Sequence, residues 1–372
     1  MDTVKAALIT CSIYQPVTGN ALMALRDIGV KEYYIQSSRA VVLRRKAGVL
    51  GIGGGIGLEE EPADRIFLHV PASEGETALR ALAVACDLNV PGRGSVIWED
   101  VDIVESSAWE ADALTPIESA EDVDIEDGLA YLTCTVQHGR GNNIVSAVLG
   151  LGVPMPLVTT GEGTGLRDKL GLIRVALPAA KEIVHAVISA HEGADILSSV
   201  ADAGKLDRLG SGFIYESPVR KGAINSMVIR GQRYSASIEQ LIGAVDDLKG
   251  STSWRKRALD SRGAATRAHT YMHDLVNVTL ICNEGFASDL VQVAMAAGAG
   301  GATIINLKHA RTDEASSPVS AARQMTELIV NRATVEAIVE AMVVAGAFDE
   351  ETAGVISLRP VNMASTHQAK RK

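Results

Sequence analysis

The sequence predicts an α+β protein that contains three tandem copies of a unit with the order βαββαβ. A strand that ends in cysteine occurs three times, and a glycine follows each cysteine eighteen positions later. The cysteine and glycine pairs are Cys11 and Gly29, Cys134 and Gly152, and Cys282 and Gly300. The alternative is chance similarity among small-residue α/β segments. Because the same order of patterns also recurs, we expect three tandem ferredoxin-like units.

Each copy begins with an apolar strand and a helix. The predicted first strands are Ala7–Cys11, Ala130–Cys134 and Val278–Cys282. The aliphatic patterns that follow predict helices around Ala21–Leu25, Ile144–Val148 and Leu290–Ala294. The glycine fits where such a helix stops, because it can adopt a positive φ and let the chain turn.

Three further strands complete each copy. The second strands are Tyr33–Gln36, Leu157–Thr160 and Thr303–Asn306. The third strands are Arg65–Val70, Leu172–Leu177 and Thr326–Val330, and in the middle copy a helix is expected over Ala179–Ala190. The fourth strands are Ser95–Trp98, Phe213–Tyr215 and Gly354–Leu358. The predicted organisation is therefore repeats at 1–105, 128–229 and 275–361, an acidic linker at 106–127, a helical spacer at 230–274 and a disordered tail at 362–372.

Composition excludes several classes of function. The chain of 372 residues has a net charge of −10, whereas general nucleic-acid binding needs a basic surface. Its four cysteines show no C-x-x-C spacing, so no disulfide framework, zinc site or other metal site is predicted. No apolar run reaches membrane-spanning length. We therefore expect a cytoplasmic protein that binds no nucleic acid and does not insert into a membrane.

The middle copy contains two glycine-rich basic loops, Gly161–Gly171 and Ala203–Gly212, separated by apolar segments. Such loops can present backbone N–H groups to an anion, and nearby cations add attraction. The alternative is that they are only tight turns. The predicted ligand-binding residues are Gly161, Gly163, Thr164, Arg167, Gly204, Lys205, Arg208, Gly210, Ser211, Gly212 and Arg220.

The second of these loops resembles the phosphate-holding loop of the PII signal-transduction (nitrogen regulatory protein PII) family, which has the form Gly-Lys-x-Gly-x-Gly. The matching residues are Gly204-Lys205, Gly210-Ser211-Gly212 and the strand Phe213-Ile214-Tyr215. Phe213 stands where the family has a second lysine. The resemblance implies that the three units form a pseudo-trimer with ligands held between neighbours. It also implies a small anionic ligand, an adenine nucleotide such as ATP or ADP as effector, and a role in nitrogen metabolism.

A long connection in the first copy, Ser37–Ala63, is basic and glycine-rich. In the PII family the corresponding loop meets the regulated protein, and glycine lets a backbone approach a partner closely. The alternative is a plain mobile loop. The predicted partner-binding residues are Arg44, Arg45, Lys46, Gly53, Gly54 and Gly55, and the partner would be an unidentified transporter or enzyme.

The chain offers no recognisable catalyst, since it contains no G-x-S-x-G, H-E-x-x-H or Walker motif. We expect no catalytic residues and no cofactor, and a protein that is not an enzyme. The predicted function is a regulator that binds a small anionic ligand and controls a partner through mobile loops, because a bound ligand can select one loop conformation. The alternative is an enzyme that acts on a phosphorylated or carboxylated metabolite at the glycine-rich loops.

Overall fold

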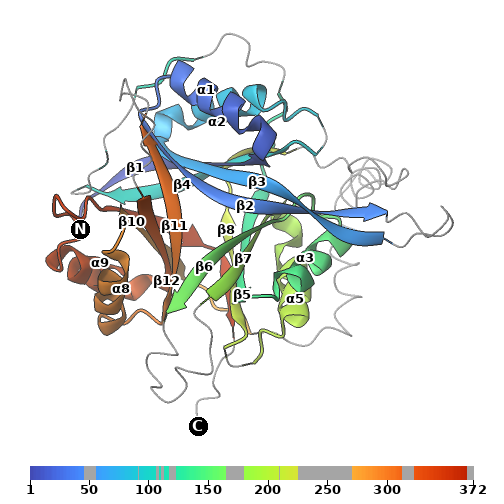
Figure 1. The fold of residues 1–372 in the computed structure, drawn as a ribbon. Helices are drawn as coiled ribbons and strands as arrows, with labels where there is room; N and C mark the ends of the chain where they lie inside the picture. The colour runs from blue at the N-terminus through green and yellow to red at the C-terminus, as the bar shows by residue number, and fades with distance from the viewer. Residues whose placement is uncertain are drawn as a thin grey trace.

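The structure, a computed structural model, describes residues 1–45, 56–90, 92–105, 109, 113–116, 123–164, 180–208, 210–224, 270–311 and 322–366. The described chain falls into three segments (Figure 1). The first segment contains β1 (Thr3–Tyr14), α1 (Thr18–Asp27), β2 (Glu32–Arg45), β3 (Ile56–Pro71), α2 (Gly75–Ala85) and β4 (Gly94–Val104). The second contains β5 (Leu129–Gln137), α3 (Gly141–Gly150), β6 (Leu157–Thr164), β7 (Ala180–Ser189), α5 (Gly193–Gly204), β8 (Gly212–Pro218) and β9 (Lys221–Ile224). The third contains β10 (Leu275–Asn283), α8 (Ala287–Ala296), β11 (Ala302–Arg311), β12 (Ala322–Asn331), α9 (Val335–Val344), β13 (Val355–Val361) and β14 (Met363–Thr366).

All of these strands belong to one antiparallel sheet of 14 strands. Its order is β11-β12-β10-β13-β4-β1-β3-β2-β6-β7-β5-β8-β14, with β9 paired to β4. A further pairing between β11 and β6 closes the first nine strands of this order into a ring. The sheet therefore runs through all three segments without a break.

The predicted fold class, three tandem ferredoxin-like units that form a pseudo-trimer, is therefore wrong. Strands of different segments pair directly, as in β4–β13, β2–β6, β2–β11 and β8–β14, so that no segment has a sheet of its own. An open edge strand exposes unpaired N–H and C=O groups, and pairing across segments satisfies many of them. The periodicity of the sequence predicted the order of elements, but not these pairings between distant strands.

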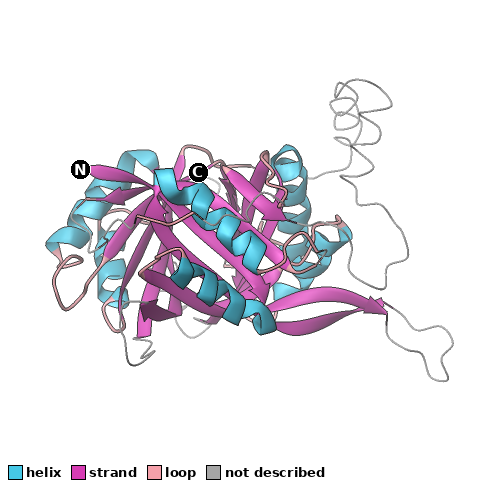
Figure 2. Ribbon diagram, turned by 90° about the horizontal axis from the view of Figure 1, so that it is seen from above, coloured by secondary structure: helices cyan, strands magenta, loops and turns pink. Residues whose placement is uncertain are grey.

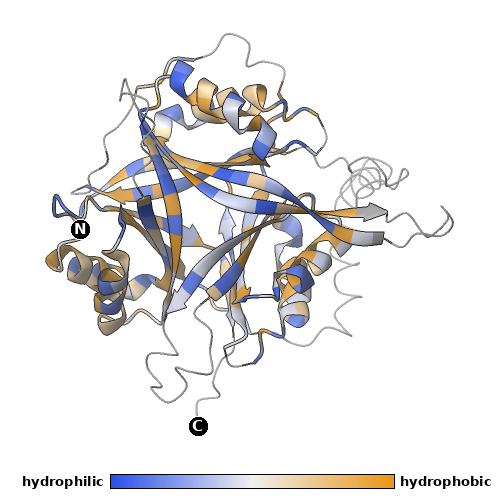
Figure 3. Cartoon of the chain, in the orientation of Figure 1, coloured by the Kyte–Doolittle hydropathy of each residue, from blue (hydrophilic) through white to orange (hydrophobic). Residues whose placement is uncertain are grey.

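The described helices lie outside the closed ring in three pairs, α1 with α2, α3 with α5, and α8 with α9 (Figures 1 and 2). Each pair covers one aliphatic core between helices and sheet. These cores include Leu25, Leu79 and Ile9 in the first segment, and Val145, Leu197 and Leu132 in the second. The third core includes Leu290, Ile338 and Leu280. The mixture of apolar and polar residues along each helix is visible in Figure 3.

The predicted first and second strands lie within β1, β5, β10, β2, β6 and β11. In contrast, the helix predicted over Ala179–Ala190 is wrong, because Ala180–Ser189 forms strand β7. Val184 packs toward α3 and α5 while Ile183 lies on the opposite face, so both faces of β7 are buried. A strand buried on both faces has no alternating pattern, and its continuous apolar run reads like a helix. The predicted strand Leu172–Leu177 lies outside the described residues.

Two segments predicted as irregular contain strands. Much of the predicted loop Ser37–Ala63 is a long antiparallel ribbon, in which β2 and β3 pair from Tyr34 with Phe67 to Arg45 with Ile56. Val41 on this ribbon is fully buried against the core of the second segment, which explains why the ribbon continues so far. The tail predicted as disordered begins with β14, which pairs with β8. The remainder of the tail lies outside the described residues.

The predicted acidic linker 106–127 is described only in part. Its Leu114 and Val123 are buried in the core beside α1 and α2, so these residues are not a solvated connection. The predicted helical spacer 230–274 lies outside the described residues up to position 269. None of the helices in the described part of the chain has the length and apolar character needed to span a lipid bilayer.

Candidate functional site

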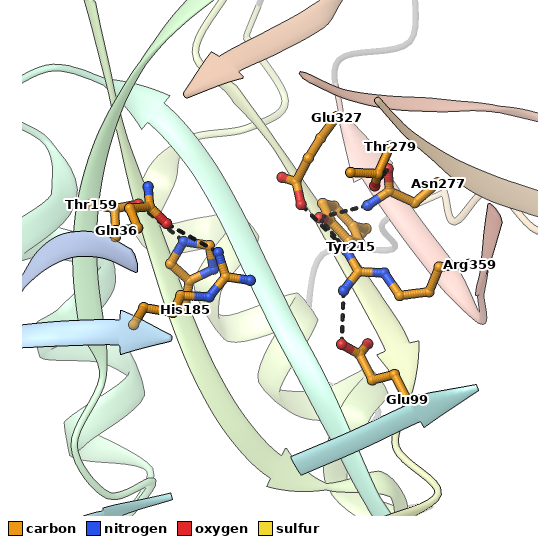
Figure 4. A network of polar contacts seen from close by, with 10 residues as sticks. Gln36, Glu99, Thr159, His185, Tyr215, Asn277, Thr279, Glu327 and Arg359 are labelled. Carbon is orange, nitrogen blue, oxygen red and sulfur yellow. Dashed lines mark hydrogen bonds and ion pairs between the residues drawn. The ribbon is translucent and has the colours of Figure 1, made fainter. Parts of the chain in front are cut away.

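A network of buried polar side chains lies in the interior between strands of all three segments (Figure 4). Strand alternation places Ile9 and Cys11 of β1 toward the helices, and Thr10 between them toward the interior. The charged and aromatic members of the network are Arg65, Glu99, Tyr131, His185, Tyr215, Glu327 and Arg359, all of them buried. Two arginines and two glutamates balance in charge, which a low-dielectric interior requires.

Arg359 is the centre of this network. Its guanidinium donates to Glu99 at 2.8 Å, to Glu327 at 3.3 Å and to the Tyr215 hydroxyl at 3.4 Å. These partners come from all three segments, on β4, β12 and β8. Burial raises the pKa of Glu99 even though Arg359 opposes the shift. The network therefore joins the three segments through ion pairs and hydrogen bonds that are shielded from solvent.

Arg65 forms a second group in this interior. It donates to the side-chain oxygen of Gln36 at 3.1 Å and lies 5.4 Å from the centre of the Phe67 ring. The Thr159 hydroxyl lies 3.0 Å from Nε2 of His185. Arg65 and Arg359 both line a cavity of about 20 Å³, enough for about one water molecule. This interior is too small for a metabolite.

The buried histidines give the interior a predicted pH dependence. Burial lowers the pKa of His69 to about 4, with Arg359 adding to the effect and Glu32 opposing it. An unfolded histidine titrates near 6.5, so the unfolded state binds a proton first as the pH falls, and stability is lost between about pH 6.5 and 4. From pH 7 to pH 5 the wild type should lose about 2 kcal/mol more unfolding free energy than His69→Gln. Urea unfolding at both pH values measures this difference, and an equal loss in the two proteins would contradict it.

Sequence reasoning missed this interior network. Glu99 and Arg359 are 260 positions apart, so no local spacing connects them. One signal was present at Arg359, which is the only charged residue of its strand, Val355–Val361. A charge at such a position must be buried with a partner of opposite sign.

A second polar feature lies where β2, β6 and β11 meet. Each of these strands pairs with the other two, so that the three form a triangle. At its corners Ile35 of β2 is opposite Lys308 of β11, Arg39 of β2 is opposite Val158 of β6, and Glu162 of β6 is opposite Ile304 of β11. Between these contacts, three residues of each strand have no strand partner on the side of the triangle. The unpaired stretches are 36–38, 159–161 and 305–307. Figure 1 shows the three strands arranged around the centre of the molecule.

A cleft of about 470 Å³ opens at this triangle, and we call it the axial cleft. Its volume lies in the range that holds small metabolites. The lining comes from all three segments and is largely polar. It consists of Ile35, Gln36, Ser37, Thr160, Gly161, Glu162, Ala180, Ile304, Asn306, Leu307, Lys308 and Gln324.

The structure places the predicted residues Gly161, Gly163 and Thr164 at the end of β6. Gly161 borders the axial cleft, whereas Thr164 accepts a hydrogen bond from the Ala302 N–H of β11 at 3.3 Å. The aliphatic part of Lys181 covers Gly163, so that a Cβ there would come within 2.6 Å of it. Arg167 lies outside the described residues. The end of β6 is thus an ordered strand rather than a loop.

The second predicted loop is a tight turn between α5 and β8. Lys205 ends α5 with a left-handed backbone at φ 52°, and its side chain and that of Arg208 are exposed. The N–H of Ser211, expected to hold a phosphate, donates to the Arg208 carbonyl at 3.1 Å. Gly204 packs among apolar side chains, including Ile144. The turn therefore uses at least one of the predicted N–H donors for its own structure.

The end of β6 and the turn between α5 and β8 lie at one edge of the second segment. Gly161 is opposite Lys181 on β7, and Lys181 is opposite Gln137 on β5. The Gln137 side chain donates to the Gly210 carbonyl at 3.1 Å. Two strand spacings, about 10 Å, therefore separate Gly161 from Gln137. The end of β6 and the α5–β8 turn are neighbours on one edge but are not in direct contact.

Arg220 is not brought to this edge. It follows β8, whose seven residues span about 20 Å from Gly212. There it pairs with Asp100 at 3.0 Å and stacks on Trp98 at 4.9 Å. Of the predicted partner-binding residues, Arg44 and Arg45 form the end of β2. Lys46, Gly53, Gly54 and Gly55 lie outside the described residues.

The side chains that could support catalysis or metal binding are dispersed. Among the described residues, no group of three or more His, Cys, Asp or Glu side chains could hold a metal ion. All four cysteines are free and buried. Burial raises the pKa of the Cys134 thiol above its ordinary value, which disfavours the thiolate.

Comparison with known proteins gives little further information. No family model matches the chain, and no curated protein matches it. A crystal structure of aspartate kinase from Synechocystis matches with 10% sequence identity and a TM-score of 0.21. The match covers 95% of this chain and 43% of that one, so the chain spans less than half the length of this kinase. A TM-score this low does not indicate a shared fold. Neither result supports nitrogen regulation, and the PII resemblance stays a prediction.

Proposed function

We propose that this protein is a non-catalytic regulator that binds a small anionic ligand, such as an adenine nucleotide, beside the glycine-rich end of β6 and the glycine-rich turn between α5 and β8. One observation carries the proposal: the register from Gly161 through Lys181 and Gln137 to Gly210 brings the end of β6 and the α5–β8 turn to one edge. Lys205 and Arg208 are exposed at that edge, where they can meet an anion from solvent. An adenine nucleotide is also the effector that the PII resemblance implies.

In this role the protein binds its ligand and catalyses no reaction on it. Its strongest acid–base candidates, Glu99, Glu327 and His185, are buried in the interior of the protein. Buried groups of this kind stabilise a fold and cannot reach a ligand at the edge. A ligand that orders this edge would favour one arrangement of the neighbouring chain, and a regulated partner could recognise that arrangement. The proposal includes a cytoplasmic location, where nucleotides are abundant.

Substitution of Lys205 tests the site. Charge-assisted hydrogen bonds contribute about 1.5–3 kcal/mol each, so Lys205→Ala should weaken ATP or ADP binding by about ten- to a hundredfold. The melting temperature should not change, because the side chain is exposed. Isothermal titration calorimetry measures both affinities.

Arg220→Ala is the matched control. It removes the same charge from the same segment, but at the far end of β8 beside Asp100. Its nucleotide affinity should equal that of the wild type. The site is wrong if the wild type gives no heat with either nucleotide at millimolar concentration, or if both variants weaken binding equally.

A further inference from the structure

We propose that the axial cleft is a second binding site, for a small zwitterion whose carboxylate faces Lys308 and whose ammonium group faces Glu162. This site lies between β2, β6 and β11, and both charged side chains border it. The cleft shares Gly161 with the edge that carries Lys205 and Arg208, but Lys308 and Glu162 are not among the residues assigned to nucleotide binding. The proposal does not depend on nucleotide binding at that edge.

The backbone around the cleft contains N–H and C=O groups that no neighbouring strand binds on this side. Residues 36–38, 159–161 and 305–307 lack strand partners on this side, so their inward N–H and C=O groups need other partners. The groups come from three strands of three segments. A polar molecule in the cleft can therefore bond to all three segments at once.

Gln36 provides a buried donor without a partner. The side chain is 3% exposed, borders the cleft, and its nitrogen makes no hydrogen bond in the structure. Its oxygen accepts from Arg65, so the amide nitrogen must be the atom that faces away from the arginine. An unsatisfied buried donor is costly, and a ligand oxygen in the cleft would satisfy it.

The charges of the lining favour a zwitterion over an ion of one sign. Lys308 and Glu162 are its two charged residues, and both are exposed to the cleft side. Glu162 is opposite Ile304, and Lys308 lies four residues further along β11, about 13 Å away. Both side chains are long enough to reach inward from these positions. A molecule with opposite charges at its two ends fits this spacing, whereas a dicarboxylate or a diamine would meet one repelling group.

The test uses 6-aminohexanoate as the probe, with hexanoate and hexylamine as analogues of equal length that each lack one charge. Calorimetry on the full chain should show saturable binding of 6-aminohexanoate, and binding of each analogue should be at least about tenfold weaker. Lys308→Met and Glu162→Gln should each lower the affinity for 6-aminohexanoate by about ten- to a hundredfold. Both side chains are exposed, so that if one variant fails to fold, the other still tests the site.

Lys5→Met is the control, because Lys5 is exposed on β1 and pairs with Asp102 away from the cleft. It should bind 6-aminohexanoate like the wild type. ATP titration of Lys308→Met should also match the wild type, which separates this site from the edge of the second segment. The proposal is overturned if the wild type does not bind the probe at millimolar concentration. Equal binding of all three compounds, or unchanged affinity in both variants, would overturn it as well.

Discussion

Replacement of Arg359 by methionine should lower the free energy of unfolding by about 3–5 kcal/mol. The substitution preserves much of the side-chain volume but removes the cation between Glu99 and Glu327. The side chains of these carboxylates are 0% and 6% exposed, so water cannot replace the lost partner. Charged groups left unpaired in the interior cost several kcal/mol. Chemical denaturation at pH 7 gives the measurement.

Two comparisons identify the cause. Adding Glu99→Gln to Arg359→Met should recover at least half of the loss, because Arg65 and Glu327 then remain as one buried cation and one buried anion. Arg332→Met removes an arginine from an exposed ion pair with Asp274, with side chains 60% and 65% exposed, and should cost less than about 1 kcal/mol. An effect of Arg359→Met as small as that of Arg332→Met would show that the interior network does not hold the segments together.

Replacement of Gly212 by alanine should lower the free energy of unfolding by about 2–4 kcal/mol. Gly212 begins β8 with φ at 154°, and a Cβ there would lie 2.3 Å from the backbone oxygen of Thr135. Backbone cannot move away from such a contact without breaking the pairing of β5 with β8. Thermal and urea unfolding measure the loss.

Gly150→Ala is the matched control in the same segment. It ends α3, has no atom within 4 Å of the added Cβ, and should change stability by less than about 1 kcal/mol. If Gly212→Ala is as stable as Gly150→Ala, the backbone of β8 does not approach that of β5 as closely as the structure shows. The sheet therefore requires Gly212 whether or not a ligand binds, so its presence in the glycine-rich loop is weak evidence for a phosphate.

Local features of the fold could be predicted from the sequence. The strands that contain Cys11, Cys134 and Cys282 are where the repeat placed them. Gly29 and Gly152 have φ values of 87° and 83°, as expected where a helix gives way to a turn. In the third segment the left-handed glycine is Gly298, at φ 117°, two residues before the expected Gly300. These features depend on neighbouring residues, which is why spacing reveals them.

Features that depend on distant residues could not be predicted in the same way. The pairing of Ser357 with Ile103 joins β13 to β4 across two segments, and no local pattern indicates it. The same holds for Arg359 with Glu99, and for the triangle around Gln36. For the predicted ligand site, the second glycine-rich loop is a turn between α5 and β8, whereas the first begins as the end of strand β6. The sequence could not show that the length of β8 carries Arg220 to the opposite end.

Equilibrium dialysis of the full chain with labelled ATP, followed by analysis of the nucleotide, tests most directly whether the protein is a binding protein and not an enzyme. The account predicts saturable binding, weakened in Lys205→Ala, and recovery of the ligand as unchanged ATP after prolonged incubation. Steady formation of ADP or AMP by the wild type, or no binding at millimolar ATP and ADP, would contradict it.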